Sequence, residues 1–317
     1  MISFSYSLSK QILEYEKLIM ALRGKILTAV ISPDTESYLR YQVFVNSLTD
    51  SLALSQIDTS PEEVDKTLHS YLMGMPYGRR NHPWLSKTEQ AILDYSNAHK
   101  FIRETWFVSS EEVSSKTIVG LHDLSSPGRL RSENILRQIV SFIDAEKDPF
   151  IQSALALIII PFMSPFTDGN GRTARLVSQL ILYKYGLDFR GFLNINHFLR
   201  ETHSSFVRFL QQAKSNSNLT LFLEYFLSGI ERELGRSLNQ IMASDPQPRK
   251  NRHSLLPRQK RILLLFEIPD MEITNRQIQK AFKVSQITAS RDLAKLVLLG
   301  FLFTHGKGRS VYYTRAY

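Results

Sequence analysis

Hydrophobic residues recur three and four positions apart through most of the first 240 residues. The series Ile12, Tyr15, Leu18, Ile19 and Leu22 is one example, and its spacing is that of one face of an α-helix. Few segments alternate with the period of two that marks a half-buried strand. Clusters rich in glycine, proline and serine interrupt the pattern near residues 74–78 and 125–128. The sequence therefore predicts a mainly α protein, with a helical region over residues 1–242.

A polar stretch follows this helical region. Residues 243–254 contain two prolines and several charged or polar side chains, and they offer almost nothing to bury. Such a composition is typical of a linker between domains. We therefore expect a second, separately folded domain over residues 255–317.

The second domain shows the pattern helix, helix, helix, β-hairpin. Pro257 suits the first turn of a helix, and Thr274 can cap a second helix over Asn275 to Phe282. Ser285 can cap a third helix that runs to Leu299 and stops at Gly300, where glycine permits a positive φ. The residues expected on the buried face of the third helix are Ala289, Leu293, Leu296 and Val297.

Two short strands, residues 301–304 and 310–313, flank a glycine-rich tip over residues 305–309. Residues 284–313 resemble the recognition helix and wing of many bacterial regulators, so we expect a winged helix-turn-helix with a small hairpin wing. The residues that would contact DNA through the third helix and the wing are Ser285, Gln286, Thr288, Ser290, Arg291, Lys295, Lys307 and Arg309.

Charge supports this expectation. The net charge of the chain is +9, and residues 249–317 alone hold 14 Lys and Arg against 4 Asp and Glu. The whole positive excess thus lies in the C-terminal fifth, which is also rich in apolar residues and so does not resemble a disordered tail. DNA is the expected partner, although a winged helix used only for protein contacts is the alternative.

Composition also excludes several classes of site and location. The chain has no cysteine, so it holds no disulfide and no thiolate metal or redox site. The N-terminal residues lack the pattern of a signal peptide, and the most apolar stretch, residues 154–163, is about half the length of a bilayer span. We expect a cytoplasmic protein with no membrane partner.

The candidate chemistry lies in the segment Ser164-Pro-Phe-Thr-Asp-Gly-Asn-Gly-Arg-Thr-Ala-Arg175. Two glycines, Gly169 and Gly171, bracket Asn170 ahead of a helix, and backbone amides at such a place form an anion-binding nest. Arg172 and Arg175 lie three residues apart on one face of a helix expected to begin near Thr173.

Asp168 supplies a hard carboxylate oxygen of the kind that binds Mg²⁺ beside phosphates. The segment therefore predicts a site for a metal-bound polyphosphate. The alternative is a tight interhelical turn with solvated arginines.

This segment resembles the signature of the Fic family, His-Pro-Phe-x-Asp/Glu-Gly-Asn-Gly-Arg-x-x-Arg, at eight of nine specified positions. Residues 148–156 resemble the helix that leads into the motif, and residues 197–210 and 219–229 resemble the helices that follow it. The resemblance implies N-terminal helices over residues 1–100 and a Fic core over about residues 101–235.

Members of the family are helical proteins that typically transfer AMP from ATP to a hydroxyl group of a target protein. By motif position, Asp168 would hold Mg²⁺. The backbone of Gly169, Asn170 and Gly171, together with Arg172, would hold the α- and β-phosphates. Arg175 would hold the γ-phosphate.

Three features depart from the family. Ser164 stands where the family has the histidine that accepts the proton of the target hydroxyl, and no histidine lies in the motif or in the forty residues before it. A simpler role for Ser164 is that of a helix N-cap. The segment from Pro127 to Arg131 resembles the start of the flap that clamps a target in the family, but an apparent helix over residues 135–143 follows directly, so the flap looks shortened.

The third departure concerns autoinhibition. Many relatives carry the pattern Ser/Thr-x-x-x-Glu-Gly/Asn, whose glutamate pairs with the second motif arginine. Leu54-Ser55-Gln56-Ile57-Asp58-Thr59 is the best match in this sequence, with Asp58 at the glutamate position. Asp58 would then be inhibitory, although an ordinary place in a turn fits it equally well.

The parts that serve nucleotide binding are retained, and those that serve transfer and its control are altered. The leading interpretation is a Fic-like protein with a nucleotide site, impaired or inactive in AMP transfer, that acts as a DNA-binding regulator. An active protein adenylyltransferase is the runner-up, and a scaffold with a structural anion nest is the third hypothesis.

Overall fold

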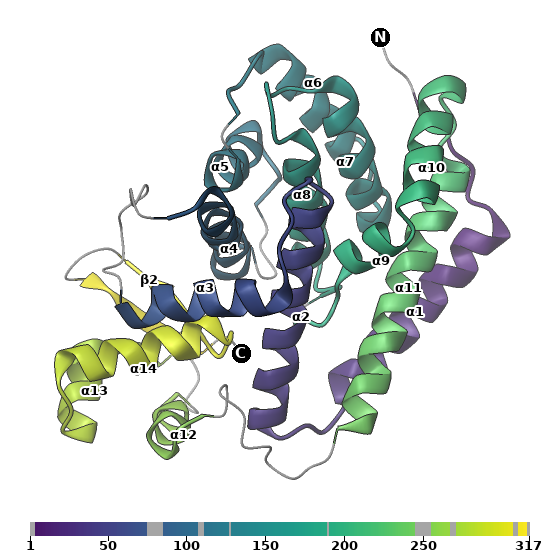
Figure 1. The fold of residues 1–317 in the computed structure, drawn as a ribbon. Helices are drawn as coiled ribbons and strands as arrows, with labels where there is room; N and C mark the ends of the chain where they lie inside the picture. The colour runs from purple at the N-terminus through teal and green to yellow at the C-terminus, as the bar shows by residue number, and fades with distance from the viewer. Residues whose placement is uncertain are drawn as a thin grey trace.

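The computed structural model describes residues 4–74, 85–106, 111–126, 128–188, 190–244, 255–266, 271–306 and 310–315. These residues form fourteen helices and one sheet of three strands (Figure 1), which confirms the predicted mainly α class. The helices of the first 244 residues are α1 (Lys10–Thr28), α2 (Pro33–Ala53), α3 (Pro61–Gly74), α4 (Lys87–Thr105), α5 (Ser115–Ser125), α6 (Glu133–Asp144), α7 (Pro149–Met163), α8 (Asn170–Lys184), α9 (Ile195–Glu201), α10 (His203–Asn216) and α11 (Thr220–Ala243).

The core of the helical region is the pair α7 and α8. Every residue of α7 from Phe150 to Ile160 is buried, because this helix is apolar on all sides and must therefore be surrounded by protein. Asp148 caps its first turn by accepting from the backbone N–H groups of residues 150 and 151. Ser153 of α7 and Ser178 of α8 are joined by a hydrogen bond of 2.7 Å between their hydroxyl groups. The loop between the two helices is thus held at both ends by a packed core.

Other helices surround this pair. α4 and α5 pack against α8, α6 packs against α7, and α1 pairs with the long helix α11 along one side of the molecule (Figure 1). The predicted helix over residues 197–210 is two helices, α9 and α10, that meet at Thr202. The Thr202 hydroxyl hydrogen-bonds to the Phe198 carbonyl and lies 2.6 Å from the Tyr225 hydroxyl. The break is therefore fixed by a tertiary contact with α11.

Residues 255–315, called the C-terminal module below, contain α12 (Pro257–Leu264), α13 (Asn275–Phe282) and α14 (Gln286–Leu298). Thr274 and Ser285 cap α13 and α14 by accepting from Gln277 N and Thr288 N. Gly300 has φ +75°, and the predicted inward face of α14 is buried. The local signals in this segment therefore predicted its helices closely.

The sheet of the C-terminal module has three antiparallel strands in the order β1-β3-β2: β1 (Ile273–Thr274), β2 (Leu302–His305) and β3 (Tyr312–Arg315). Leu302 pairs with Arg315, and Ile273 pairs with Tyr313. The strands of the predicted hairpin are displaced by one or two residues. The sequence did not predict β1, since a two-residue strand has no period and Thr274 already carried a capping signal.

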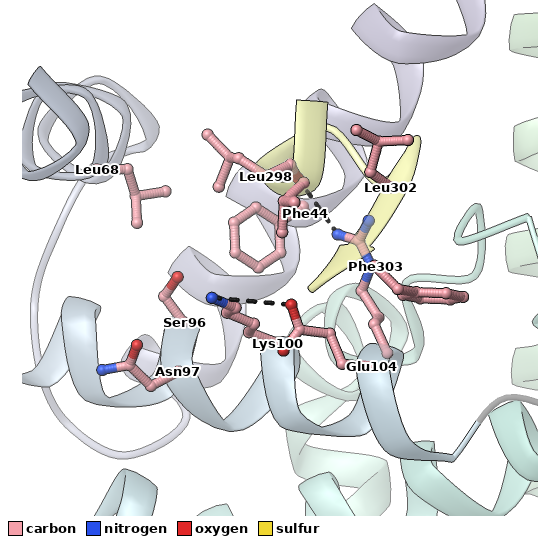
Figure 2. A pocket seen from close by; sticks show the side chains of 11 residues that line it. Phe44, Leu68, Ser96, Asn97, Lys100, Glu104, Leu298, Leu302 and Phe303 are labelled. Atoms are coloured by element: carbon pink, nitrogen blue, oxygen red, sulfur yellow. Dashed lines mark hydrogen bonds and ion pairs between the residues drawn. The ribbon is translucent and has the colours of Figure 1, made fainter. Parts of the chain in front are cut away.

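The C-terminal module packs against the helical region, with α14 and β2 lying against α3 and α4. Figure 2 shows the contact, where Phe44 and Leu68 lie near Leu298 and Leu302. Arg103 donates to the Leu298 carbonyl at 3.4 Å. Apolar contact and a charged donor thus combine at this junction. Within the described part of the chain, no helix has both the length and the apolarity needed to cross a bilayer.

Candidate functional site

A cavity of about 1040 Å³ opens above the loop that joins α7 to α8. Its walls are the residues just after α2, the first half of α4, and the start of α8. The motif residues that line it are Ser164, Thr167, Asp168, Gly169, Asn170, Gly171, Arg172 and Arg175, and the residues from elsewhere are Leu54, Ser55, Ile57, Leu85, Ser86, Lys87, Gln90, Ala91, Asp94 and Arg131. The structure therefore brings every predicted nucleotide and metal residue to one cavity.

Ser164 ends α7 and does not begin the next helix. Its backbone is left-handed, with φ 44° and ψ 62°, and its hydroxyl donates to the Pro161 carbonyl at 2.8 Å. The predicted N-cap role is therefore wrong. Helix α8 begins at Asn170, three residues before the predicted start, and its N-cap is Gly169. Ser164 lines the cavity at the motif position of the missing histidine.

The Asn170 side chain holds the loop in shape. Its Oδ1 accepts from Phe166 N at 3.0 Å, and its Nδ2 donates to the Phe166 carbonyl at 2.9 Å. Because both Oδ1 and Nδ2 bond to the backbone of Phe166, the Asn170 side chain serves the shape of the loop. The first-turn N–H groups of α8 face the cavity with the partial positive charge of a helix N-terminus, which favours an anion.

Gly169 is the residue at which this loop requires glycine. Its φ is +73°, and a Cβ built on it would lie 2.4 Å from the Ser126 Cβ. The side-chain direction at Gly169 thus points into α5 and the segment after it, away from the cavity. Asp168 Oδ1 accepts from Gly169 N at 2.6 Å, which leaves Oδ2 for a cation.

The two motif arginines are buried and are held by neutral oxygens. Arg172 donates to the Ser125 carbonyl at 2.5 Å, and its Nε has no hydrogen-bond partner among the described residues. Arg175 donates through Nε to Ser51 Oγ and through Nη2 to Ser51 O and Ser55 Oγ, at 2.7–2.9 Å. Burial lowers the pKa of both guanidinium groups. Among the described residues neither forms a salt bridge, so both can gain from pairing with an anion.

The hydroxyl groups that hold Arg175 come from Ser51 and Ser55. If Ser51 is aligned with the first position of Ser/Thr-x-x-x-Glu-Gly/Asn, Ser55 stands at the glutamate position and Gln56 at the Gly/Asn position, so only Ser51 matches the pattern. Gln56 has φ +59°, a conformation that favours the glycine or asparagine of the pattern. Asp58, the residue expected from the sequence, is exposed and does not line the cavity. The structure brings Ser51 and Ser55, not Asp58, to Arg175.

His122 is a site-associated residue that the sequence did not indicate. Its ring stacks on Phe166 with centroids 3.7 Å apart, and its Nδ1 lies 3.0 Å from Thr173 Oγ1. It is fully buried behind the loop, and burial lowers the pKa of its imidazole. It does not line the cavity, and neither does any other histidine among the described residues. Only the three-dimensional packing of α5 against α8 could have placed it here.

Residues 128–132, which precede α6, form an extended stretch. Arg131 N donates to the Pro165 carbonyl at 2.7 Å, and Thr167 N donates to the Arg129 carbonyl at 2.9 Å. Leu130 and Phe166 form one antiparallel bridge. Residues 128–132 contain no hairpin, in line with the expected short flap, and Pro127 lies outside the described residues.

The candidate DNA residues gather on α14. Ser285, Gln286, Ser290 and Arg291 are exposed, and Thr288 and Lys295 are half-buried. Asn275 of α13 donates to Ser290 Oγ at 2.8 Å, which fixes the two helices relative to each other. Lys307 and Arg309 lie outside the described residues.

One group of possible metal ligands lies away from the cavity. His197, Glu201 and Glu233 offer ligand atoms within 4.8 Å of one another. Arg232 lies 2.7 Å from Glu201 Oε2, and Arg236 lies 3.2 Å from Glu233 Oε1. This group is therefore an ion-pair network, and its carboxylates already have cationic partners.

Residues 66–182 match the family model described as the Fic/DOC family. A protein adenylyltransferase Fic of Nematostella vectensis is 30% identical over 122 residues, and the protein adenylyltransferase fic-1 of Caenorhabditis elegans is 28% identical over 118 residues. Each match covers 30% of this chain, and they cover 29% and 23% of the relatives. The chain thus spans less than a third of the length of these curated relatives.

Solved structures agree in fold. The crystal structure of a Fic family protein from Desulfovibrio desulfuricans G20 superposes with a TM-score of 0.61 at 16% identity, covering 98% of this chain and 97% of that one. Fic-1 (aa134–508) from C. elegans gives a TM-score of 0.58 at 21% identity, covering 74% of this chain and 73% of that one. At these identities the likeness shows the fold alone. The family match therefore assigns residues 66–182 of this chain to a Fic/DOC family domain, and the solved structures agree with it in fold.

Proposed function

We propose that this protein is a nucleotide-binding Fic protein whose AMP transfer to hydroxyl groups is strongly impaired, and that it acts as a DNA-binding regulator. One observation carries the proposal. A single cavity combines an anion-binding loop and two buried arginines with a serine at the position of the proton acceptor. The parts that bind a nucleotide are therefore together, and the part that starts transfer to a neutral hydroxyl is absent.

A nucleoside triphosphate with Mg²⁺ is the proposed ligand. The first-turn amides of α8 and Arg172 would hold the α- and β-phosphates, and Arg175 would hold the γ-phosphate. Asp168 fits a magnesium ion because it is an exposed carboxylate beside the anion loop with one oxygen left over. When bound, the ion would neutralise charge on the phosphates.

Impaired transfer follows from the side chains that line the cavity. A serine hydroxyl is no general base at neutral pH, and the buried His122 lies behind the loop. Loss of a general base typically lowers a rate by roughly 10²–10⁴-fold. The electrostatic parts would still stabilise charge at phosphorus. We therefore infer that AMP transfer to target hydroxyls is very slow.

Two measurements test this proposal. Calorimetry of the full chain with Mg²⁺ and ATP should show binding that Arg175→Met weakens. Incubation with labelled ATP and lysate should show very little protein labelling, and Ser164→His should give at most slow self-labelling. Absence of nucleotide binding would favour the scaffold hypothesis. Strong labelling of lysate proteins by the unaltered chain would favour the hypothesis of an active adenylyltransferase. The curated relatives carry that name, which supports this alternative.

We propose further that the C-terminal module is a winged helix-turn-helix domain, joined by the linker of residues 243–254, and that it binds duplex DNA through α14. The positive excess of residues 249–317 and the exposed face of α14 support this proposal. A cytoplasmic location would agree with a DNA partner.

A mobility-shift series over a range of salt concentrations tests the DNA proposal. Arg291→Gln should weaken binding and reduce the salt dependence by about one counterion if this side chain contacts a phosphate. Arg137→Gln, on exposed α6, is the matched control. Binding that is absent, or equal in both variants, would remove Arg291 and its helix face from the proposed interface.

A further inference from the structure

Arg131 is a cavity residue outside the motif, on the extended segment that pairs with the residues after Ser164. Its backbone N–H bonds to Pro165, the residue after Ser164, and its side chain reaches the Thr167 carbonyl with Nη2 at 3.5 Å. Arg131, Ser164 and Thr167 all line the cavity. The place where an acceptor must lie to reach a bound nucleotide is thus bordered by a guanidinium group and a hydroxyl.

A proton acceptor is required only when the attacking oxygen carries a proton. An alcohol has one, so a site without a base handles it slowly. The doubly charged form of a phosphate group has none on its attacking oxygen, and a phosphate monoester reaches this form above a second pKa of about 6. For such an acceptor the substitution at Ser164 costs nothing in proton transfer. What the site must supply is a cation that holds the acceptor against the negative charge of the nucleotide.

The charges that line the cavity are suited to two anions. Lys87, Arg131, Arg172 and Arg175 supply four positive charges, and the carboxylates of Asp94 and Asp168 supply two negative ones. Arg172 and Arg175 are buried at the phosphate end, whereas Arg131 is exposed at the mouth. Arginine is the side chain best shaped to hold a phosphate group through paired N–H donors.

We propose that the cavity transfers a nucleotidyl group from a nucleoside triphosphate to a phosphate oxyanion held by Arg131. The inference rests on the proposed nucleotide site and names the class of its acceptor. An ionised phosphate oxygen attacks the α-phosphorus, a new P–O bond forms, and the bond to the β-phosphate oxygen breaks. Pyrophosphate leaves with that electron pair. One anhydride bond is exchanged for another, and no proton has to be removed.

Inorganic phosphate is the simplest probe of this reaction. With unlabelled ATP, Mg²⁺ and ³²P-labelled phosphate, the full chain should release pyrophosphate and form ADP that carries the label in its β-phosphate. Hydrolysis of ATP gives only unlabelled ADP, so the label separates the two reactions. Arg131→Gln should lower labelled ADP by roughly 10–100-fold, since a hydrogen bond to a charged group contributes about 1.5–3 kcal/mol. Arg129→Gln changes an exposed arginine of the same segment that does not line the cavity, and it should match the unaltered chain.

Calorimetry with ATP in the same preparations separates the two levels of the argument. If ATP binds and no labelled ADP forms, or if Arg131→Gln and Arg129→Gln form it equally, the acceptor assignment is overturned while the nucleotide site stands. If ATP does not bind at all, the proposed function itself fails. Binding of ATP that survives Arg131→Gln, with labelled ADP lost, supports the assignment.

Discussion

Ser55 illustrates how one side chain changes the state of a buried charge. Arg175 donates to this hydroxyl and to that of Ser51. The family pattern would supply a carboxylate at the position of Ser55. A neutral hydroxyl holds a guanidinium group less strongly than a carboxylate does. In the proposed nucleotide site, Arg175 therefore remains free to exchange these hydroxyl contacts for a γ-phosphate.

Replacing Ser55 with glutamate should restore a charged partner for Arg175. The glutamate would compete with the γ-phosphate, so Ser55→Glu should weaken ATP binding by roughly 10–100-fold, the range of a hydrogen bond to a charged group. ADP, which lacks that phosphate, should be much less affected. Ser55→Ala removes the hydroxyl without adding charge and should leave ATP binding nearly unchanged. Calorimetry with both nucleotides checks the pattern, and an equal loss for ATP and ADP would contradict the assignment of Arg175.

His99 and Asp188 give a second prediction at the residue scale. Both are buried in a small pocket with Arg40 and Arg103. Burial, with the positive charge of Arg103, lowers the pKa of His99 to about 3. Burial raises the pKa of Asp188 to about 7, against the attraction of both arginines. Below pH 6.5 the His99 imidazole takes up a proton in the unfolded state but not in the folded state. The free energy of unfolding therefore decreases as the pH falls.

Asp188 acts in the opposite direction. Between about pH 4 and 7 the Asp188 carboxyl keeps its proton in the folded state and loses it in the unfolded state. The stabilisation that Asp188 contributes is therefore lost as the pH rises through this range. Relative to the unaltered chain, His99→Phe should become more stable as pH falls from 6.5 to 4, and Asp188→Asn less stable. Each slope should approach, at most, about 1.4 kcal/mol per pH unit. Urea denaturation at several pH values measures this, and parallel curves for the three proteins would contradict it.

At the scale of elements, the sequence predicted those helix boundaries that depend on nearby capping residues. The bounds of α13, the caps Thr274 and Ser285, and the stop at Gly300 followed from side chains within a few residues of each boundary. The start of α8 could not be predicted in this way. The side chain of Asn170 hydrogen-bonds to the backbone of Phe166, and the helix begins at Asn170, three residues before the predicted start. That bond depends on the shape of the whole loop.

The loop and the first turn of α8 offer a matched pair of glycines. An added methyl group at Gly169 would overlap Ser126 and would sit on a backbone with positive φ. Gly169→Ala should therefore destabilise the fold by about 1–3 kcal/mol. At Gly171 the nearest atom is Arg175 Nη1 at 3.5 Å, an ordinary contact. Gly171→Ala should be neutral or should stabilise α8 by up to about 1 kcal/mol. Chemical denaturation measures the free energy of unfolding of both variants. An equal loss of stability in the two would contradict this difference between the glycines.

At the scale of the whole molecule, the motif predicted the floor of the cavity but not the residues that surround the motif loop. Ser51 comes from the last turn of α2, Ser55 from the residues just after that helix, His122 from α5, and Arg131 from the stretch before α6. These residues lie between 34 and 124 positions from the motif residues that they contact. No local periodicity carries such information, because it arises only when the helices pack around α8.

The same packing joins the cavity to the C-terminal module. The first half of α4 lines the cavity, and its last turns reach α14 and β2. Lys100 and Glu104 form an ion pair of 3.7 Å beside Phe303 (Figure 2). Arg103, in the last turn of α4, donates to the Leu298 carbonyl, where the partial negative charge of a helix C-terminus favours a cation.

Removing this guanidinium group should loosen the module. Arg103→Met keeps the apolar stem of the side chain but leaves the Leu298 carbonyl, at the end of α14, without its cationic donor. The amides of residues 296–300 should then exchange hydrogen faster by roughly 5–20-fold, as expected for a loss of about 1–2 kcal/mol at a partly buried helix C-terminus. Exchange within α7 and α8 should be unchanged. Arg137→Met, on exposed α6 and far from the junction, serves as the control. If residues 296–300 stay as protected in Arg103→Met as in the control, the apolar contacts of Phe44, Leu68 and Leu302 hold the module without help from this charge.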